Sequence, residues 1–113
     1  MANDAYMNIP LDIKDPEPLM VNKATTLRLD QQIVWATATG TNYDIILPPV
    51  SQAVGRVYII HAINDAVGTI TVKSRSDDNS GSPYASGAMT AAGDYVILIS
   101  NGRRWFELAE LTT

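Results

Sequence analysis

The sequence contains no cysteine among its 113 residues. This absence excludes a disulfide framework and any thiolate metal site, and it leaves the redox compartment of the protein undetermined. The sequence also has no apolar run near the roughly 20 residues that a membrane-spanning helix needs. Residues 1–19 lack a basic region followed by an apolar one, so we expect no signal peptide. We therefore expect no membrane partner.

Basic residues are scarce as well. The chain has 8 Lys and Arg against 12 Asp and Glu, which gives a formal net charge of −4. The only adjacent basic pair is Arg103 and Arg104. Because phosphate binding requires clustered Lys and Arg, this balance argues against nucleic acid or an anionic membrane as the main partner.

Residues that commonly carry catalysis are sparse. His61 is the only histidine, and it lies in an apolar segment where a core or interface position is expected. No serine or carboxylate stands at a spacing that forms half of a recognisable dyad. The stretch Asp-Asp-Asn-Ser-Gly at 77–81 lacks the alternating acidic pattern and the final glutamate of a calcium loop. We therefore expect no catalytic residue, no cofactor, no metal and no enzymatic activity.

Strand-forming segments dominate the chain from Thr25 onward, and no segment of useful length has a helical period. Each segment is rich in β-branched and aromatic residues and is bounded by Gly, Pro, Asn or Asp. The segments are 25–30, 31–40, 42–49, 55–63, 69–74, 94–100 and 103–109. This pattern predicts one all-β domain, a small antiparallel β-sandwich or barrel of about seven strands, with no internal repeat.

An Asn-Gly pair at 101–102 separates the last two apolar segments. This dipeptide favours a two-residue type I′ hairpin turn, which requires a positive φ at both central residues. Such a turn pairs Leu98 with Trp105 on one face and Ile97 with Phe106 on the other. Both faces of the predicted hairpin are therefore apolar, whereas an antiparallel sheet with one wet face alternates apolar and polar residues.

Three segments, 55–63, 94–100 and 103–109, have apolar residues on both faces. A domain of this size has one interior, and soluble monomers rarely expose contiguous apolar patches beyond a few hundred Å². We therefore expect the second faces to pack against another copy or a larger assembly. The residues expected in the core or in an oligomer interface are Tyr58, Ile60, Tyr95, Ile97, Trp105 and Phe106.

Residues 1–23 differ from the rest of the chain. Three prolines interrupt this segment, and proline neither continues a helix nor donates to a sheet ladder. Apolar residues nevertheless recur, so we expect an extended N-terminal arm that precedes a β-domain at 24–113, with a disordered terminus as the alternative. The arm residues expected to contact a partner are Met7, Ile9, Leu11, Ile13, Leu19 and Val21.

A set of turn and core residues follows a recognisable order. The set consists of Leu47-Pro48, Gly55 with Tyr58, Ile70-Thr71-Val72, and a hairpin with Tyr95, Leu98, Ser100, Asn101, Gly102 and Trp105. In this order, residues 42–109 resemble a domain that recurs in virion structural proteins of tailed phages. Such domains occur in capsid decoration (cement) proteins and in tail-fibre or spike segments, and neither class implies an active site.

The short chain, its arm and its acidic balance favour the decoration class. The resemblance then implies a homotrimer on the capsid surface of the virion, where it stabilises the assembled head. Its arm is expected to bind the major capsid protein by strand addition. The alternative is a host-recognition module of a tail fibre, in which the loop at 75–87 and exposed aromatic residues bind a surface glycan.

Overall fold

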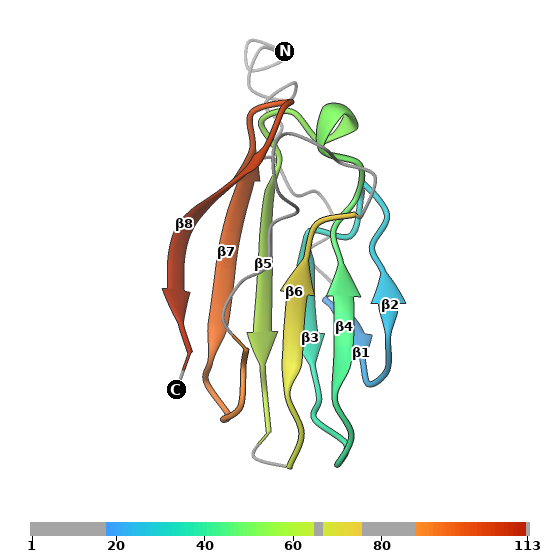
Figure 1. Cartoon of the computed structure of the whole chain (residues 1–113), viewed down its shortest axis with the longest axis vertical. Helices are drawn as coiled ribbons and strands as arrows, with labels where there is room; N and C mark the ends of the chain where they lie inside the picture. The colour runs from blue at the N-terminus through green and yellow to red at the C-terminus, as the bar shows by residue number, and fades with distance from the viewer. Residues whose placement is uncertain (1–17, 65–66, 76–87, 113) are drawn as a thin grey trace, which may run out of the picture.

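The computed structural model describes residues 18–64, 67–75 and 88–112, which form an all-β structure (Figure 1). Among these residues, no helix is long and apolar enough to cross a membrane. The elements within the described ranges are β1 (Leu19–Val21), β2 (Thr25–Thr26), β3 (Ile33–Ala36), β4 (Tyr43–Ile46), the 3₁₀ helix η1 (Val50–Gln52), β5 (Val57–Ala62), β6 (Ile70–Lys73), β7 (Tyr95–Ser100) and β8 (Trp105–Leu111).

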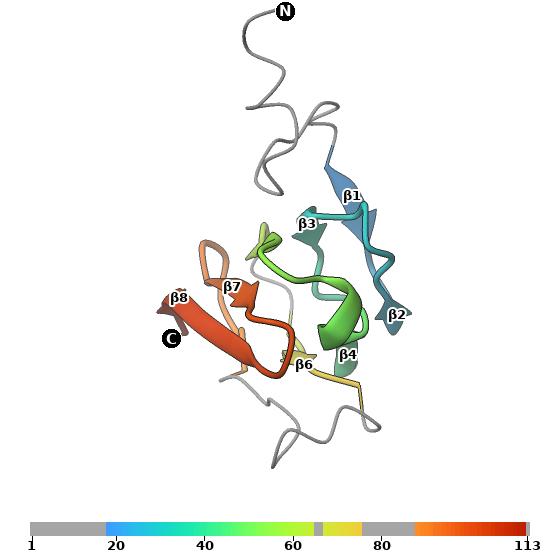
Figure 2. The same cartoon turned by 90° about the horizontal axis from the view of Figure 1, so that it is seen from above.

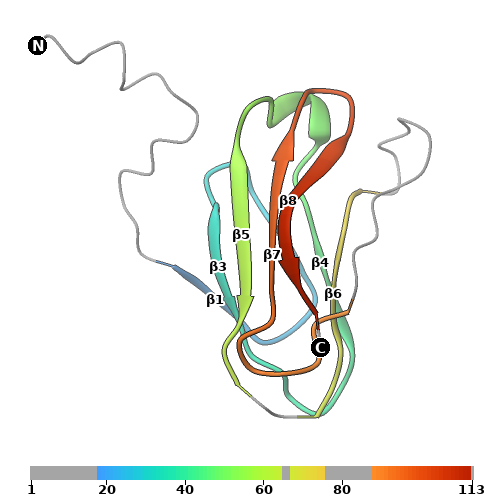
Figure 3. The ribbon, with the colours of Figure 1, turned by 90° about the vertical axis from the view of Figure 1, so that its left-hand side faces the viewer.

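The strands form two sheets that face each other, as the end-on and side views show (Figures 2 and 3). Sheet A has five strands in the order β1-β3-β5-β7-β8, and sheet B has three strands in the order β2-β4-β6. From β1 to β6 the chain alternates between the two sheets, so it winds around the core. The β7–β8 hairpin then extends sheet A beside β5.

The winding makes most strand pairs parallel. In sheet A, β1 pairs with β3 and β3 with β5 in parallel, and both pairings in sheet B are also parallel. Only β5–β7 and β7–β8 are antiparallel pairs of named strands in the described part of the chain. The predicted antiparallel arrangement is therefore wrong for β1 to β6. Parallel neighbours need a crossover connection, and here a strand of the opposite sheet supplies each crossover.

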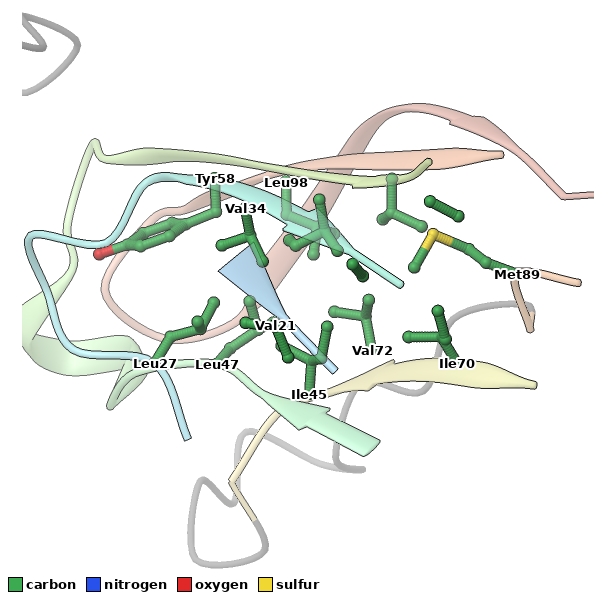
Figure 4. Packing of buried hydrophobic residues seen from close by; sticks show 14 of the residues in the cluster. Val21, Leu27, Val34, Ile45, Leu47, Tyr58, Ile70, Val72, Met89 and Leu98 are labelled. Atoms are coloured by element: carbon green, nitrogen blue, oxygen red, sulfur yellow. The ribbon is translucent and has the colours of Figure 1, made fainter. Parts of the chain in front are cut away.

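The core lies between the sheets and follows the pleat of their strands (Figure 4). In β5, Tyr58, Ile60 and Ala62 are buried, and in sheet B the buried side chains include Ile45 and Val72. The core also contains Trp105 of β8. The rings of Tyr58 and Trp105 meet edge to face, with their centroids 5.4 Å apart. Tyr58, Ile60 and Trp105 are thus core residues.

The β7–β8 connection is longer than the predicted two-residue turn. Ser100 pairs with Trp105, so the loop comprises residues 101–104, and a register shift follows between Ile97 and Leu98. Asn101 does not have a positive φ, which a type I′ turn requires. Instead, its side-chain Oδ1 accepts hydrogen bonds at 2.9 Å from the backbone N–H groups of residues 103 and 104.

This longer loop makes the predicted hairpin register wrong by two residues next to the turn. The register is shifted by an even number of residues, and side chains alternate with a period of two along a strand. Trp105 and Phe106 therefore remain on the faces predicted for them, with Phe106 now opposite Ile99.

The β structure begins before the predicted boundary at residue 24. The strand β1 pairs with β3, and the carbonyl oxygen of Val21 accepts hydrogen bonds from the N–H and Oγ1 of Thr37 at 2.8 and 3.1 Å. Val21 is 4% exposed, and Leu19 packs against the core. Leu19 and Val21 are therefore part of the fold, because their strand completes sheet A. The other predicted arm residues, Met7, Ile9, Leu11 and Ile13, lie outside the described residues.

Candidate interaction surface

The side chains of sheet A that point away from sheet B form an apolar surface, which we call the outer face. Burial alternates along β5 and β7, so every second residue of these strands points away from the core. Strand pairing extends this set across the sheet. The outer face consists of Met20, Ile33, Trp35, Val57, Ile59, His61, Tyr95, Ile97, Ile99, Phe106, Ala109 and Leu111.

The strand register arranges these residues in three rows that cross the sheet. Opposite residues of paired strands have Cβ atoms about 4.5–5.5 Å apart, so each row is continuous. The rows are Met20–Trp35–His61–Tyr95–Leu111, Ile33–Ile59–Ile97–Ala109 and Val57–Ile99–Phe106.

The most exposed residues of the outer face lie on the edge strands β1 and β8 and on β3. Met20 is 58% exposed, Trp35 40%, Phe106 44% and Leu111 49%. The side chains in the middle, such as Ile59 and Ile97, are half-buried. A single exposed apolar residue needs no explanation, but a contiguous apolar surface usually marks an interaction site.

The corresponding surface of sheet B is different. Its strands present Asp44, Ile46, Thr71 and Lys73 away from the core. Lys73 Nζ lies 3.0 Å from Asp44 Oδ2, and both side chains are a little over 40% exposed. This ordinary, mixed surface suits contact with water. The two sheets therefore differ in what their outward sides can bind.

The described residues show little that suggests a metal site or a catalytic site. They contain no group of three or more His, Cys, Asp or Glu side chains placed to hold a metal ion. Asp94 is 1% exposed, and its carboxylate accepts hydrogen bonds from the N–H groups of Thr90 and Ala91 at 3.0 and 3.2 Å. Asp94 therefore shapes the turn before β7. His61 lies on the outer face.

Burial perturbs the pKa of two phenols. It raises the pKa of Tyr58 to about 12, against a smaller opposing effect of the nearby Arg56 charge. Burial also raises the pKa of Tyr43, whose hydroxyl donates to the Thr37 carbonyl at 2.8 Å. Both hydroxyl groups bond to backbone carbonyls, so their role is structural.

The pleat divides the six residues predicted for the core or an interface. Tyr58, Ile60 and Trp105 lie in the core, as described above. The other three, Tyr95, Ile97 and Phe106, lie on the outer face. The segment 76–87, which carries most of the loop proposed for glycan binding, lies outside the described residues.

The sequence interpretation missed the contribution of β1 and β3, namely Met20, Ile33 and Trp35. A signal for them exists. The stretches Leu19–Val21 and Ile33–Ala36 are apolar at every position, so each has an apolar second face.

Comparison of the chain with protein-family models, curated proteins and solved structures found no match. The outer face is therefore the candidate functional site on its own geometry.

Proposed function

We propose that this protein is a structural subunit that associates with copies of itself through the outer face. The observation that carries this proposal is the row pattern, which joins apolar side chains from all five strands of sheet A. No Asp, Glu, Lys or Arg of the described residues occupies a position in these rows.

A second copy of the chain fits this surface in charge and in size. An uncharged face needs an uncharged partner, and the outer face of another copy meets this requirement. Five strands about 4.8 Å apart span about 20 Å, and a six-residue strand such as β5 adds about 20 Å of length. Each outer face therefore covers about 400 Å², and three such faces around a common axis bury on the order of 1,000 Å² in total, the lower end of what a specific assembly needs.

We further propose that the assembly is a trimer that decorates the head of a tailed phage. Support for this part comes from the resemblance of residues 42–109 to a virion domain. In a trimer, the outer face of each subunit points towards a common three-fold axis and contacts the outer faces of both neighbours. Residues that precede β1 contact the major capsid protein. Binding to the assembled head alone stabilises that state by mass action.

Light scattering over a dilution series tests self-association. We expect the wild-type chain of 12.3 kDa to give a trimer of about 37 kDa. Ile97→Lys places a charge in the middle of the outer face and should give a folded monomer, because burying an unpaired charge is costly. Thr71→Lys is the matched control on the outward side of sheet B and should assemble as the wild type does.

Two results overturn the assembly proposal: a wild-type monomer at every concentration, or a folded Ile97→Lys variant that assembles normally. Co-sedimentation with expanded, undecorated heads of tailed phages tests the decoration role separately. We expect the trimer to sediment with the heads. A trimer that stays in the supernatant removes the decoration role and leaves self-association in place.

A further inference from the structure

We propose that protonation of His61 takes the assembly apart, so that the outer faces associate near neutral pH and separate in mildly acidic solution. This inference rests on the proposed self-association through the outer face, because it concerns the regulation of that same surface.

His61 lies in the end row of the outer face, on β5, the central strand of sheet A. Its row neighbours are Trp35 on β3 and Tyr95 on β7. Along its own strand, Ile59 is the next residue on the same face. A partner that covers this row therefore encloses the imidazole together with Trp35, Ile59 and Tyr95, away from water.

Among the residues that the structure describes, no charged group on the strands beside β5 faces His61. The strand β3 places no titratable side chain on the outer face, and β7 places only the Tyr95 phenol there. The carboxylate of Asp94 is buried and holds backbone N–H groups. Glu110 pairs with Val96 and so belongs to the inward side of β8. These statements concern the described residues, and Asp65, four residues after His61 in the sequence, lies outside them.

Covering the outer face therefore costs more free energy when His61 is protonated than when it is neutral. A neutral imidazole is tolerated in an apolar interface, whereas an imidazolium loses its hydration without gaining a counter-charge. Contact with aromatic rings returns only part of that loss. The assembled form accordingly binds fewer protons than the free subunit. By linkage, association weakens as the pH falls, by up to about tenfold per pH unit for each covered imidazole.

The composition makes this response easy to assign. The chain has one histidine and no cysteine, and an imidazole is the side chain that ordinarily changes charge between about pH 5 and 8. The general charge of the protein works in the opposite direction. At pH 7 the chain carries −4, and acidification towards its pI of about 4.6 reduces repulsion between copies. A weaker association at low pH therefore points to a specific group.

The test is light scattering of the full chain at pH 7.5, 6.5 and 5.5, at a concentration near the midpoint of assembly. We expect the wild-type midpoint concentration to rise at least tenfold between pH 7.5 and 5.5, with an unchanged circular dichroism spectrum. His61→Gln keeps a polar side chain that cannot take up a proton in this range, and its midpoint should not move. Asp65→Asn is the control for the carboxylate closest to His61 in the sequence and should behave as the wild type does.

The outcomes separate this inference from the proposed function. A wild-type chain that assembles equally at pH 7.5 and 5.5 overturns the role of His61 and leaves self-association intact. Dissociation at pH 5.5 that His61→Gln shows to the same extent also overturns it, as does dissociation that occurs only with unfolding. A chain that is monomeric at every pH and concentration removes the proposed function itself.

Discussion

Trp105 and Trp35 show how the pleat assigns two residues of one type to different tasks. Trp105 is 6% exposed and packs edge to face on Tyr58, where it contributes to the core. Trp35 is 40% exposed and lies in the long row of the outer face. The two tyrosines of sheet A divide in the same way, with Tyr58 inside and Tyr95 outside. The position of a residue along the alternating strand, rather than its type, decides whether its side chain lies in the core or on the outer face.

Tyr58 gives a prediction at this scale. Its hydroxyl donates to the Leu29 carbonyl at 2.7 Å, and Arg56 donates to the same oxygen at 3.2 Å. Tyr58→Phe therefore leaves that oxygen with a partner, and we expect it to lower the free energy of unfolding by about 1 kcal/mol at neutral pH. Urea unfolding measures the loss. A loss near zero contradicts the proposed value of this hydrogen bond.

The same variant predicts a pH dependence. Burial raises the pKa of Tyr58 to about 12 in the folded state, from 10.0 for a free phenol. A raised folded-state pKa gives stability that is complete below pH 10 and is lost as the pH rises towards 12. Tyr58→Phe should therefore lose less stability than the wild type between pH 10 and 12. The remaining loss includes Tyr43, whose pKa is also raised.

At the scale of elements, β1 is the shortest strand of sheet A but is firmly attached. The Val21 carbonyl accepts hydrogen bonds from both the N–H and the Oγ1 hydroxyl of Thr37. The Val21 side chain is buried among core residues of both sheets. The strand thus covers the exposed edge of β3 and belongs to the folded unit.

Two deletions distinguish the contribution of β1 to stability from the contribution of residues 1–17 to head binding. Removal of residues 1–17 should leave the free energy of unfolding unchanged and abolish co-sedimentation with undecorated phage heads. Removal of residues 1–23 also deletes Val21 and its hydrogen bonds, so we expect a further loss of about 2–4 kcal/mol. Thermal and urea unfolding measure both. Equal stability of the two shortened chains would contradict the role of β1, and normal head binding by the first would contradict the role of residues 1–17.

At the scale of the whole molecule, the outward sides of sheets A and B differ in charge. Sheet B presents Asp44 and Lys73 to solvent, and the rows of sheet A contain no charged residue among those described. The winding of β1 to β6 creates this separation, because it places alternate strands of the sequence in opposite layers. One side of the molecule is therefore suited to water and the other to a partner.

This division predicts how salts affect assembly. Association through an uncharged face should not weaken between 50 and 500 mM NaCl, because salt screens the repulsion between copies but finds no ion pairs in the rows to screen. Ammonium sulfate should strengthen association, because it favours burial of apolar surface. Sedimentation velocity at pH 7.5 measures both effects. An assembly that dissociates at 500 mM NaCl would instead indicate ion pairs at the interface.

The sequence by itself determined the strand content and the face to which many residues point. Alternation along 55–63 assigns Tyr58 and His61 to opposite faces, and the structure confirms this. The separation of Trp105 from Phe106 holds even though the predicted turn is too short. Periodicity is a local property of the chain, so it can be read without knowledge of the neighbours.

Only the tertiary structure decided which strands are neighbours and in which direction they run. The same alternation is compatible with parallel and antiparallel partners, so the winding of β1 to β6 could not be predicted from it. The hairpin register depended on how Asn101 bonds to the loop backbone. The rows of the outer face arise only when β1, β3, β5, β7 and β8 align, because a continuous surface is a property of residues far apart in the sequence.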